Sequence, residues 1–208
     1  TPQKGFNGTR HFPRQDLGTF MQSLGMRFGA HVNAHTSFDE TVYELQIPTD
    51  DAAVIDRSLL IMEDWARDVS FDAVEIDKER GVVLEEWRLG LGADERIQQA
   101  QFPLLLEGSR YADRLPIGTP EVIQNVSYRR VRQFYEDWYR PGLMAVVAVG
   151  DFDPAVIEEK IRSHFGSIEA PSSPKPRPAY DVPDRPGTVY SVITDPEVTG
   201  TRIRVSNH

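Results

Sequence analysis

The sequence has no cysteine among its 208 residues, which excludes disulfides and thiol chemistry without fixing the compartment. It also lacks an apolar run near the ~20 residues that span a bilayer, and its start carries no secretory-signal pattern. Basic residues are scarce: 23 Lys and Arg against 32 Asp and Glu give a formal net charge of −9. Because nucleic-acid binding depends on basic side chains that neutralise phosphates, we expect no nucleic-acid partner. The absence of a long apolar run predicts that the chain has no membrane span.

The composition is otherwise that of a globular protein, with 39% hydrophobic and 26% charged residues. Apolar spacing and capping residues predict six helices, at residues 16–24, 50–68, 72–89, 94–107, 127–139 and 153–165.

The remaining segments carry strand and loop patterns. Residues 28–47 are rich in Val, Thr, Phe and Tyr and predict a β-hairpin that turns near Ser37 to Asp39. The apolar run 143–149 predicts a buried strand, residues 188–193 and 201–205 predict two more, and the proline-rich stretch 171–187 predicts a linker or surface strap. The whole predicts an α+β fold, a two-layer sandwich with a mostly antiparallel sheet covered by helices.

The most informative helix is 72–92, DAVEIDKERGVVLEEWRLGLG. On a helical wheel, Glu75, Glu79 and Glu86 lie along one edge of the apolar stripe that contains Trp87, and Glu79 and Glu86 are about 10 Å apart along the axis. Two interpretations stay open. The edge is a solvated surface with ordinary ion pairs, or a carboxylate at the border of the apolar stripe is a metal ligand or a base.

The histidines do not complete a metal site on their own. A catalytic zinc needs about three protein ligands. His31 and His35 face the same side of the predicted hairpin but stand about 13 Å apart at strand rise, too far to share one ion. His11 and His164 are expected to be solitary residues at the surface or core edge, and neither HExxH nor HxxEH occurs.

Five segments in the same order resemble the pitrilysin/insulinase-type zinc metallopeptidases, the family with the inverted zinc motif HxxEH. The matching segments are FNGTRHFP at 6–13, GMRFGAHVNAHTSFDETVY at 25–43, ERGVVLEEWR at 79–88, YADRLPIGTPEVI at 111–123 and FYEDWYRPGLMAVVAVGDF at 134–152. The fold that the resemblance implies is a metallopeptidase half-domain that is incomplete at its N-terminus.

The resemblance implies roles for four residues. Glu86 matches the third zinc ligand, and Glu79 matches a second acidic group that supports the site. Asn33 and Ala34 match the edge strand on which such peptidases lay an extended peptide substrate. In the family, zinc held by two histidines and a glutamate activates water for peptide hydrolysis, and a homologous C-terminal half or partner subunit completes the chamber.

The sequence departs from the family where HxxEH belongs. The second histidine and its glutamate would fall at Gln3 and Pro2, and the first histidine would precede Thr1. Three explanations stay open: the chain was cut there, it is a degenerate non-catalytic homologue, or its origin is unrelated. We expect zinc in the full-length parent rather than in this stretch alone, and no peptidase activity from this stretch. An uncovered sheet edge or apolar face should favour self-association or partial disorder near both ends.

The predicted function is therefore part of a zinc-dependent endopeptidase that hydrolyses peptides or unfolded protein segments. The alternative is a non-catalytic homologue that serves as the peptide-binding or scaffold half of a peptidase complex. Residues 1–170 would form a partial N-terminal peptidase domain, 171–187 a strap and 188–208 final strands of the same domain. By analogy with bacterial members, we expect an exported protein, periplasmic or secreted.

Overall fold

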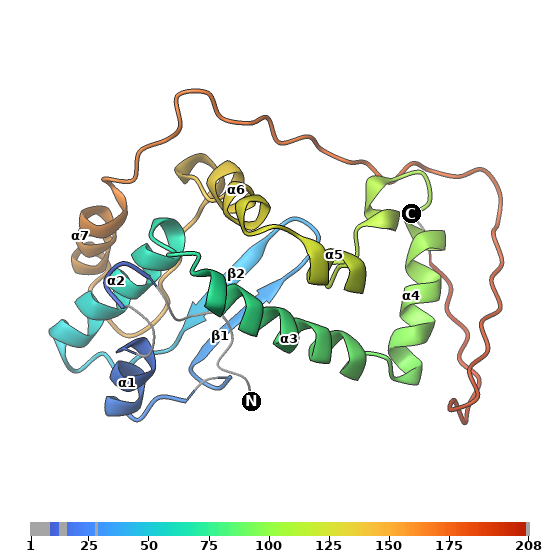
Figure 1. Ribbon diagram of the computed structural model, residues 1–208, viewed down its shortest axis with the longest axis horizontal. Helices are drawn as coiled ribbons and strands as arrows, with labels where there is room; N and C mark the ends of the chain where they lie inside the picture. Colours follow the sequence, from blue (N-terminus) through green and yellow to red (C-terminus); the bar gives the residue numbers. More distant parts are fainter. Residues whose placement is uncertain (1–8, 13–15, 28, 207–208) are drawn as a thin grey trace.

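A computed structural model describes residues 9–12, 16–27 and 29–206, so the expected zinc-motif positions, residues 2–5, lie outside the described residues. The α+β class is confirmed: a two-stranded antiparallel sheet lies among helices (Figure 1). The elements are α1 (Asp16–Ser23), β1 (Val32–Thr36), β2 (Thr41–Leu45), α2 (Ala52–Arg67), α3 (Ala73–Leu89), α4 (Ala93–Leu105), the 3₁₀ turn η1 (Arg110–Asp113), α5 (Pro120–Asn125), α6 (Tyr128–Trp138), the 3₁₀ turn η2 (Pro141–Leu143) and α7 (Pro154–Phe165).

All six predicted helices form, and four of them begin at a side-chain cap. Asp51, Asp72, Ser127 and Asp153 each accept a hydrogen bond from a backbone N–H of the first turn of α2, α3, α6 or α7. These first-turn N–H groups have no partner within the helix, so a capping side chain fixes where the helix starts.

The hairpin forms as predicted and is anchored in the core. Val32 of β1 lies opposite Leu45 of β2, and Ser37 N donates to the Glu40 carbonyl across the turn at 2.9 Å. The base of the hairpin packs into a cluster of buried side chains, namely Phe12, Met21, Met26, Val32, Ile61 and Trp65. The core thus joins the N-terminal segment, α1, α2 and the hairpin.

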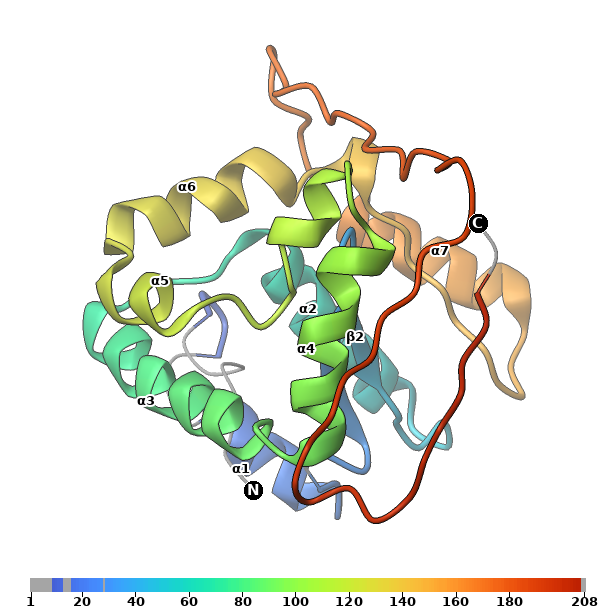
Figure 2. The same ribbon diagram turned by 90° about the vertical axis from the view of Figure 1, so that its right-hand side faces the viewer.

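The helices divide around this hairpin. In Figure 2, α3, α5 and α6 lie together on one side of the molecule and α7 lies on the opposite side. Tyr43 of β2 links the hairpin to the end of α6, because its hydroxyl lies 3.0 Å from the Tyr139 hydroxyl. Burial raises the pKa of Tyr43, so this hydroxyl stays protonated and able to donate.

The three further predicted strands are wrong. Residues 143–149, 188–193 and 201–205 form no strand, and within the described part of the chain β1 and β2 pair only with each other. Val147 and Val149, expected inside a buried strand, are 82% and 93% exposed. The physical reason is that a strand needs a neighbour to bond its backbone groups, and high β-propensity does not supply one. The result is the predicted uncovered apolar surface, while self-association stays a prediction.

The strap predicted for residues 171–187 continues in the same extended form to residue 206, and we call residues 171–206 the strap. The strap passes α6 and then runs beside α4, as Figures 1 and 2 both show. None of its residues is buried. The division into residues 1–170, 171–187 and 188–208 stays a prediction. In the described part of the chain, no helix has the length and apolar character needed to cross a bilayer.

Candidate functional site

The outer edge of β1 carries backbone groups that do not bond to β2. Bonded and non-bonded pairs alternate along an antiparallel ladder. Gln46 N donates to the His31 carbonyl at 2.8 Å and Ser37 N to the Glu40 carbonyl at 2.9 Å, so these two pairs fix the alternation. It follows that Asn33 and His35 bond to β2 through their backbones.

The backbone groups of Ala34 consequently point to the other edge, where the described residues provide no strand. Ala34 is partly buried against the core cluster, whereas the Asn33 side chain is exposed. The two predicted substrate residues therefore offer different groups. Ala34 offers an N–H and a C=O on the open edge, and Asn33 offers a side-chain amide beside it. An extended peptide can pair with such an edge through its own backbone.

The two predicted zinc-site glutamates lie on α3, two turns apart, with Glu79 half-buried and Glu86 exposed. Both glutamates have an interaction partner. The neighbouring acids are ion-paired as expected for an ordinary helix surface: Lys78 lies 2.7 Å from Glu75, and Arg88 pairs with Glu85.

Arg80 holds this helix against α5. Its guanidinium donates to the carbonyls of Ile123 and Val126 and lies 3.2 Å from Asp77, and its side chain is only 16% exposed. The bonded carbonyls belong to the C-terminal end of α5, where they have no partner within the helix. A single residue next to Glu79 therefore sets the position of α3 relative to α5.

The described residues do not complete a zinc site around Glu86. In the part of the chain that the structure describes, the only group of three His, Asp or Glu side chains with ligand atoms within 4.8 Å of one another is His11, Asp64 and Asp68. Its two aspartates lie at the C-terminal end of α2, and the group contains neither Glu79 nor Glu86. One glutamate supplies one of the roughly three protein ligands that a catalytic zinc needs.

The cluster around Asp64 is a hydrogen-bonded anchor. Asp64 is fully buried and accepts from Thr9 Oγ1 at 2.6 Å and from His11 N at 3.0 Å. His11 Nδ1 lies 2.6 Å from the other carboxylate oxygen, and Arg67 Nε lies 3.2 Å from Asp68. Both oxygens of Asp64 are therefore occupied, and the nearby guanidinium disfavours a cation.

His11 and His164 lie at the surface or core edge as expected, but the expectation that they are solitary is wrong. His11 bonds Asp64, and His164 of α7 lies 2.9 Å from the buried Glu63 of α2. Both partners are acids on α2 that the sequence gives no direct reason to expect inside. The available signal was weak: Asp64 sits next to Trp65, which the helical spacing predicts to be buried.

The fold is shared with solved protease structures. The first half of the periplasmic protease PqqL from Escherichia coli superimposes with a TM-score of 0.80 at 36% identity, covering 86% of this chain and 38% of that chain. The ferredoxin protease FusC, solved in complex with Arabidopsis ferredoxin, superimposes with a TM-score of 0.78 at 28% identity, covering 88% of this chain and 20% of that one.

Curated sequences give the same result. A zinc protease PQQL-like protein of Arabidopsis thaliana is 37% identical over 202 residues, 97% of this chain and 21% of the relative. A probable zinc protease PqqL of Escherichia coli is 38% identical over 165 residues, 79% of this chain and 18% of the relative. The chain therefore spans about a fifth of the length of these relatives.

The fold and these relatives show that this chain is related to zinc proteases. The family follows from two domain models: the model for insulinase, peptidase family M16, matches residues 5–102, and that for the M16 inactive domain matches residues 125–206. The chain belongs to peptidase family M16, the insulinase family, as its motifs predict.

Proposed function

We propose that this chain is part of an M16 zinc endopeptidase, in which it supplies the strand edge that binds an extended peptide and one carboxylate ligand of the zinc. The observation that carries the proposal is the backbone of Ala34, which faces an edge of β1 without a strand among the described residues. Backbone pairing tolerates many side chains, which suits an enzyme that takes peptides or unfolded segments.

Glu86 is proposed as the zinc ligand and Glu79 as the group that supports it. Zinc, when bound, lowers the pKa of a bound water so that it can attack a peptide bond. The exposed position of Glu86 leaves its carboxylate accessible to a metal, and the half-buried position of Glu79 suits a residue that orients a neighbour. Since the described residues offer one such ligand, we expect the isolated chain to be inactive and to bind zinc weakly.

The peptide edge is tested by Ala34→Pro. Proline removes the N–H that faces the open edge, and a strand tolerates proline where its N–H is not bonded to a neighbour. We expect the circular dichroism of the chain to be retained, while the Kd for a fluorescein-labelled peptide of about ten residues rises about tenfold. The matched control is His35→Ala, which keeps the backbone of the strand. Equal Kd values for the parent chain and Ala34→Pro would exclude this edge as the binding site.

The metal role is tested by Glu86→Gln in the protein expressed from its complete gene. The amide keeps the shape of the side chain and removes its charge, so we expect loss of zinc by metal analysis and loss of proteolysis with the fold retained. Glu85→Gln, on the same helix and paired with Arg88, is the control. Full zinc content and activity in the Glu86→Gln protein would remove Glu86 from the site.

The proposal also names partners and a location. A homologous half or partner subunit is proposed to complete the peptidase, because the chain covers only 38% of the PqqL half-structure and about a fifth of the whole relatives. Export to the periplasm is proposed from the periplasmic PqqL of Escherichia coli.

A further inference from the structure

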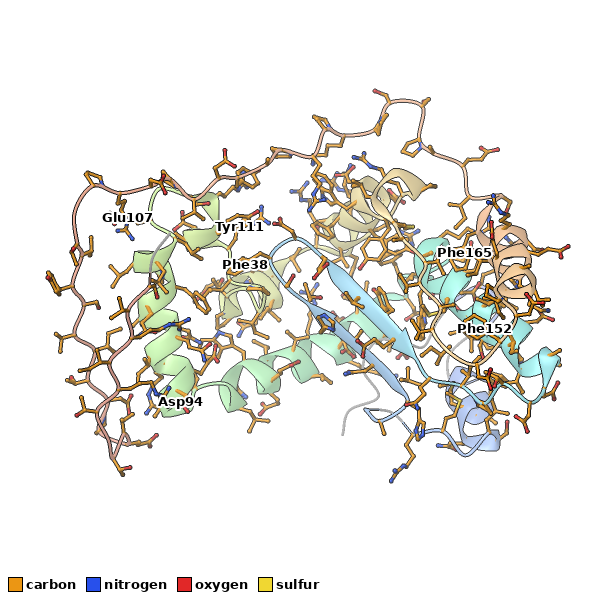
Figure 3. All side chains as sticks on the ribbon, turned by 180° about the vertical axis from the view of Figure 1, so that it is seen from behind. Phe38, Asp94, Glu107, Tyr111, Phe152 and Phe165 are labelled. Carbon is orange, nitrogen blue, oxygen red and sulfur yellow. The ribbon has the colours of Figure 1, made fainter. Side chains whose placement is uncertain are left out.

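The tip of the β1–β2 hairpin is held by side chains from distant parts of the chain. Asp39 at the turn accepts a hydrogen bond from the Tyr111 hydroxyl of η1. Phe38 packs edge-on against Tyr111, with ring centroids 5.3 Å apart, and against Phe102 of α4 at 6.2 Å. Figure 3 shows Phe38 and Tyr111 side by side at the end of the hairpin.

Two arginines complete this arrangement. Arg114 donates to the Phe38 carbonyl at 3.0 Å and lies 3.9 Å from the Asp39 carboxylate. Arg177, which belongs to the strap, donates to the Asp39 carbonyl at 3.3 Å and lies 4.0 Å from its carboxylate. We call Asp39, Tyr111, Arg114 and Arg177 the tip clamp.

The clamp matters because burial holds only the other end of the hairpin in the core cluster. A two-stranded hairpin alone is marginally stable in water. Its base is fixed by burial, since Val32 is 1% exposed within the core cluster. Its tip is exposed, with Asp39 itself 44% exposed, so the clamp limits the movement that the packing of Phe38 leaves possible. Between the two ends lies Ala34, with its open backbone edge.

We propose that the tip clamp consists of positioning residues for peptide binding, which hold β1 straight and ready to pair with a substrate strand. The inference rests on the proposed function of the β1 edge. A rigid edge loses less conformational entropy when a peptide docks, so holding the edge in advance strengthens binding. The hydrogen bond to Asp39 raises the pKa of the Tyr111 hydroxyl, which therefore remains a donor at neutral pH.

The experiment compares Tyr111→Phe with Tyr128→Phe in this chain. Each substitution removes one exposed hydroxyl that donates to an aspartate, Asp39 for Tyr111 and Asp77 for Tyr128, and only the first belongs to the clamp. We expect Tyr111→Phe to raise amide exchange across residues 32–45 and the Kd for the fluorescein-labelled peptide by about threefold to tenfold, with little change in Tm. Tyr128→Phe should change neither quantity by more than about twofold.

The second variant, Asp39→Asn, removes the charge and should reproduce the effect of Tyr111→Phe. If the parent chain binds the peptide and both clamp variants match it in Kd, the clamp role is overturned while the proposed function stands. Faster exchange with unchanged Kd overturns it as well. If the parent chain does not bind the peptide, the proposed function fails, and the positioning role fails with it.

Discussion

Replacing Asp64 by alanine is expected to destabilise the protein by about 3–5 kcal/mol, because a buried carboxylate that accepts hydrogen bonds from two donors is removed. The carboxylate is 0% exposed and accepts hydrogen bonds from the Thr9 hydroxyl and the His11 backbone N–H, and the His11 ring lies 2.6 Å from its other oxygen. Hydrogen bonds to a charged group contribute about 1.5–3 kcal/mol each. The His11 ring is 40% exposed, so its contact contributes least.

Truncation also leaves the Thr9 hydroxyl, on a residue that is 5% exposed, without its acceptor. The loss should therefore exceed the carboxylate's own contribution, and for a chain of this size it should lower Tm by about 10 °C. Asp64→Asn keeps an acceptor for one donor and should cost roughly half as much.

The assay is urea and thermal unfolding of the 208-residue chain followed by circular dichroism. The control is Asp56→Asn on the same helix, where the carboxylate is 49% exposed and its pair with Lys160 should be worth about 0–1 kcal/mol. A loss below about 1 kcal/mol for Asp64→Ala, or an equal loss for Asp56→Asn, would refute the assignment of Asp64 as the anchor of residues 9–12.

Three further outcomes are expected. Arg80→Lys should cost about 1–2 kcal/mol in urea unfolding, because lysine cannot reach two carbonyls at once, whereas Arg88→Lys, at a 62% exposed site, should cost about 0.5 or less. Arg96 lowers the pKa of Asp195 through its hydrogen bonds, so the contact between them is present above pH ~4 and is lost as the pH falls below that value. Amide exchange of residues 193–198 should therefore rise below pH ~4. Arg96→Gln should abolish this pH dependence of the exchange. Light scattering should show self-association that Val149→Lys reduces, and a monomer at all concentrations contradicts this.

The six predicted helices and the hairpin could be predicted because their signals are local, whereas the short helix α5 was missed. Asp72 lies at the start of an apolar repeat and caps α3, and the pattern of residues 28–47 contains both strands and the turn. Such elements are specified by residues within a few positions of one another, so one sequence suffices.

The missed features depend on partners far away in the chain. Residues 143–149 have the composition of a buried strand, but strand formation requires a neighbour that the pattern cannot name. The burial of Asp64 depends on His11, 53 positions away, and the contact of Tyr111 with Asp39 spans 72 positions. The proposed roles of Glu86 and Ala34 rest on the family resemblance. The ladder geometry adds one point, that the Ala34 N–H and C=O face away from β2.

The strap gives the molecule an outer layer with its own response to solution conditions. Many of its attachments are ion pairs, such as Lys175 with Asp137 at 3.1 Å and Asp195 with Arg96 at 2.7 Å. Contacts of this kind weaken with added salt, while the apolar cluster around Val32 and Trp65 does not. Added salt, or a pH below ~4, should thus release the strap from α4 while the interior stays folded. Once Arg177 of the strap no longer contacts Asp39, the tip of the hairpin should become more mobile before any helix unfolds.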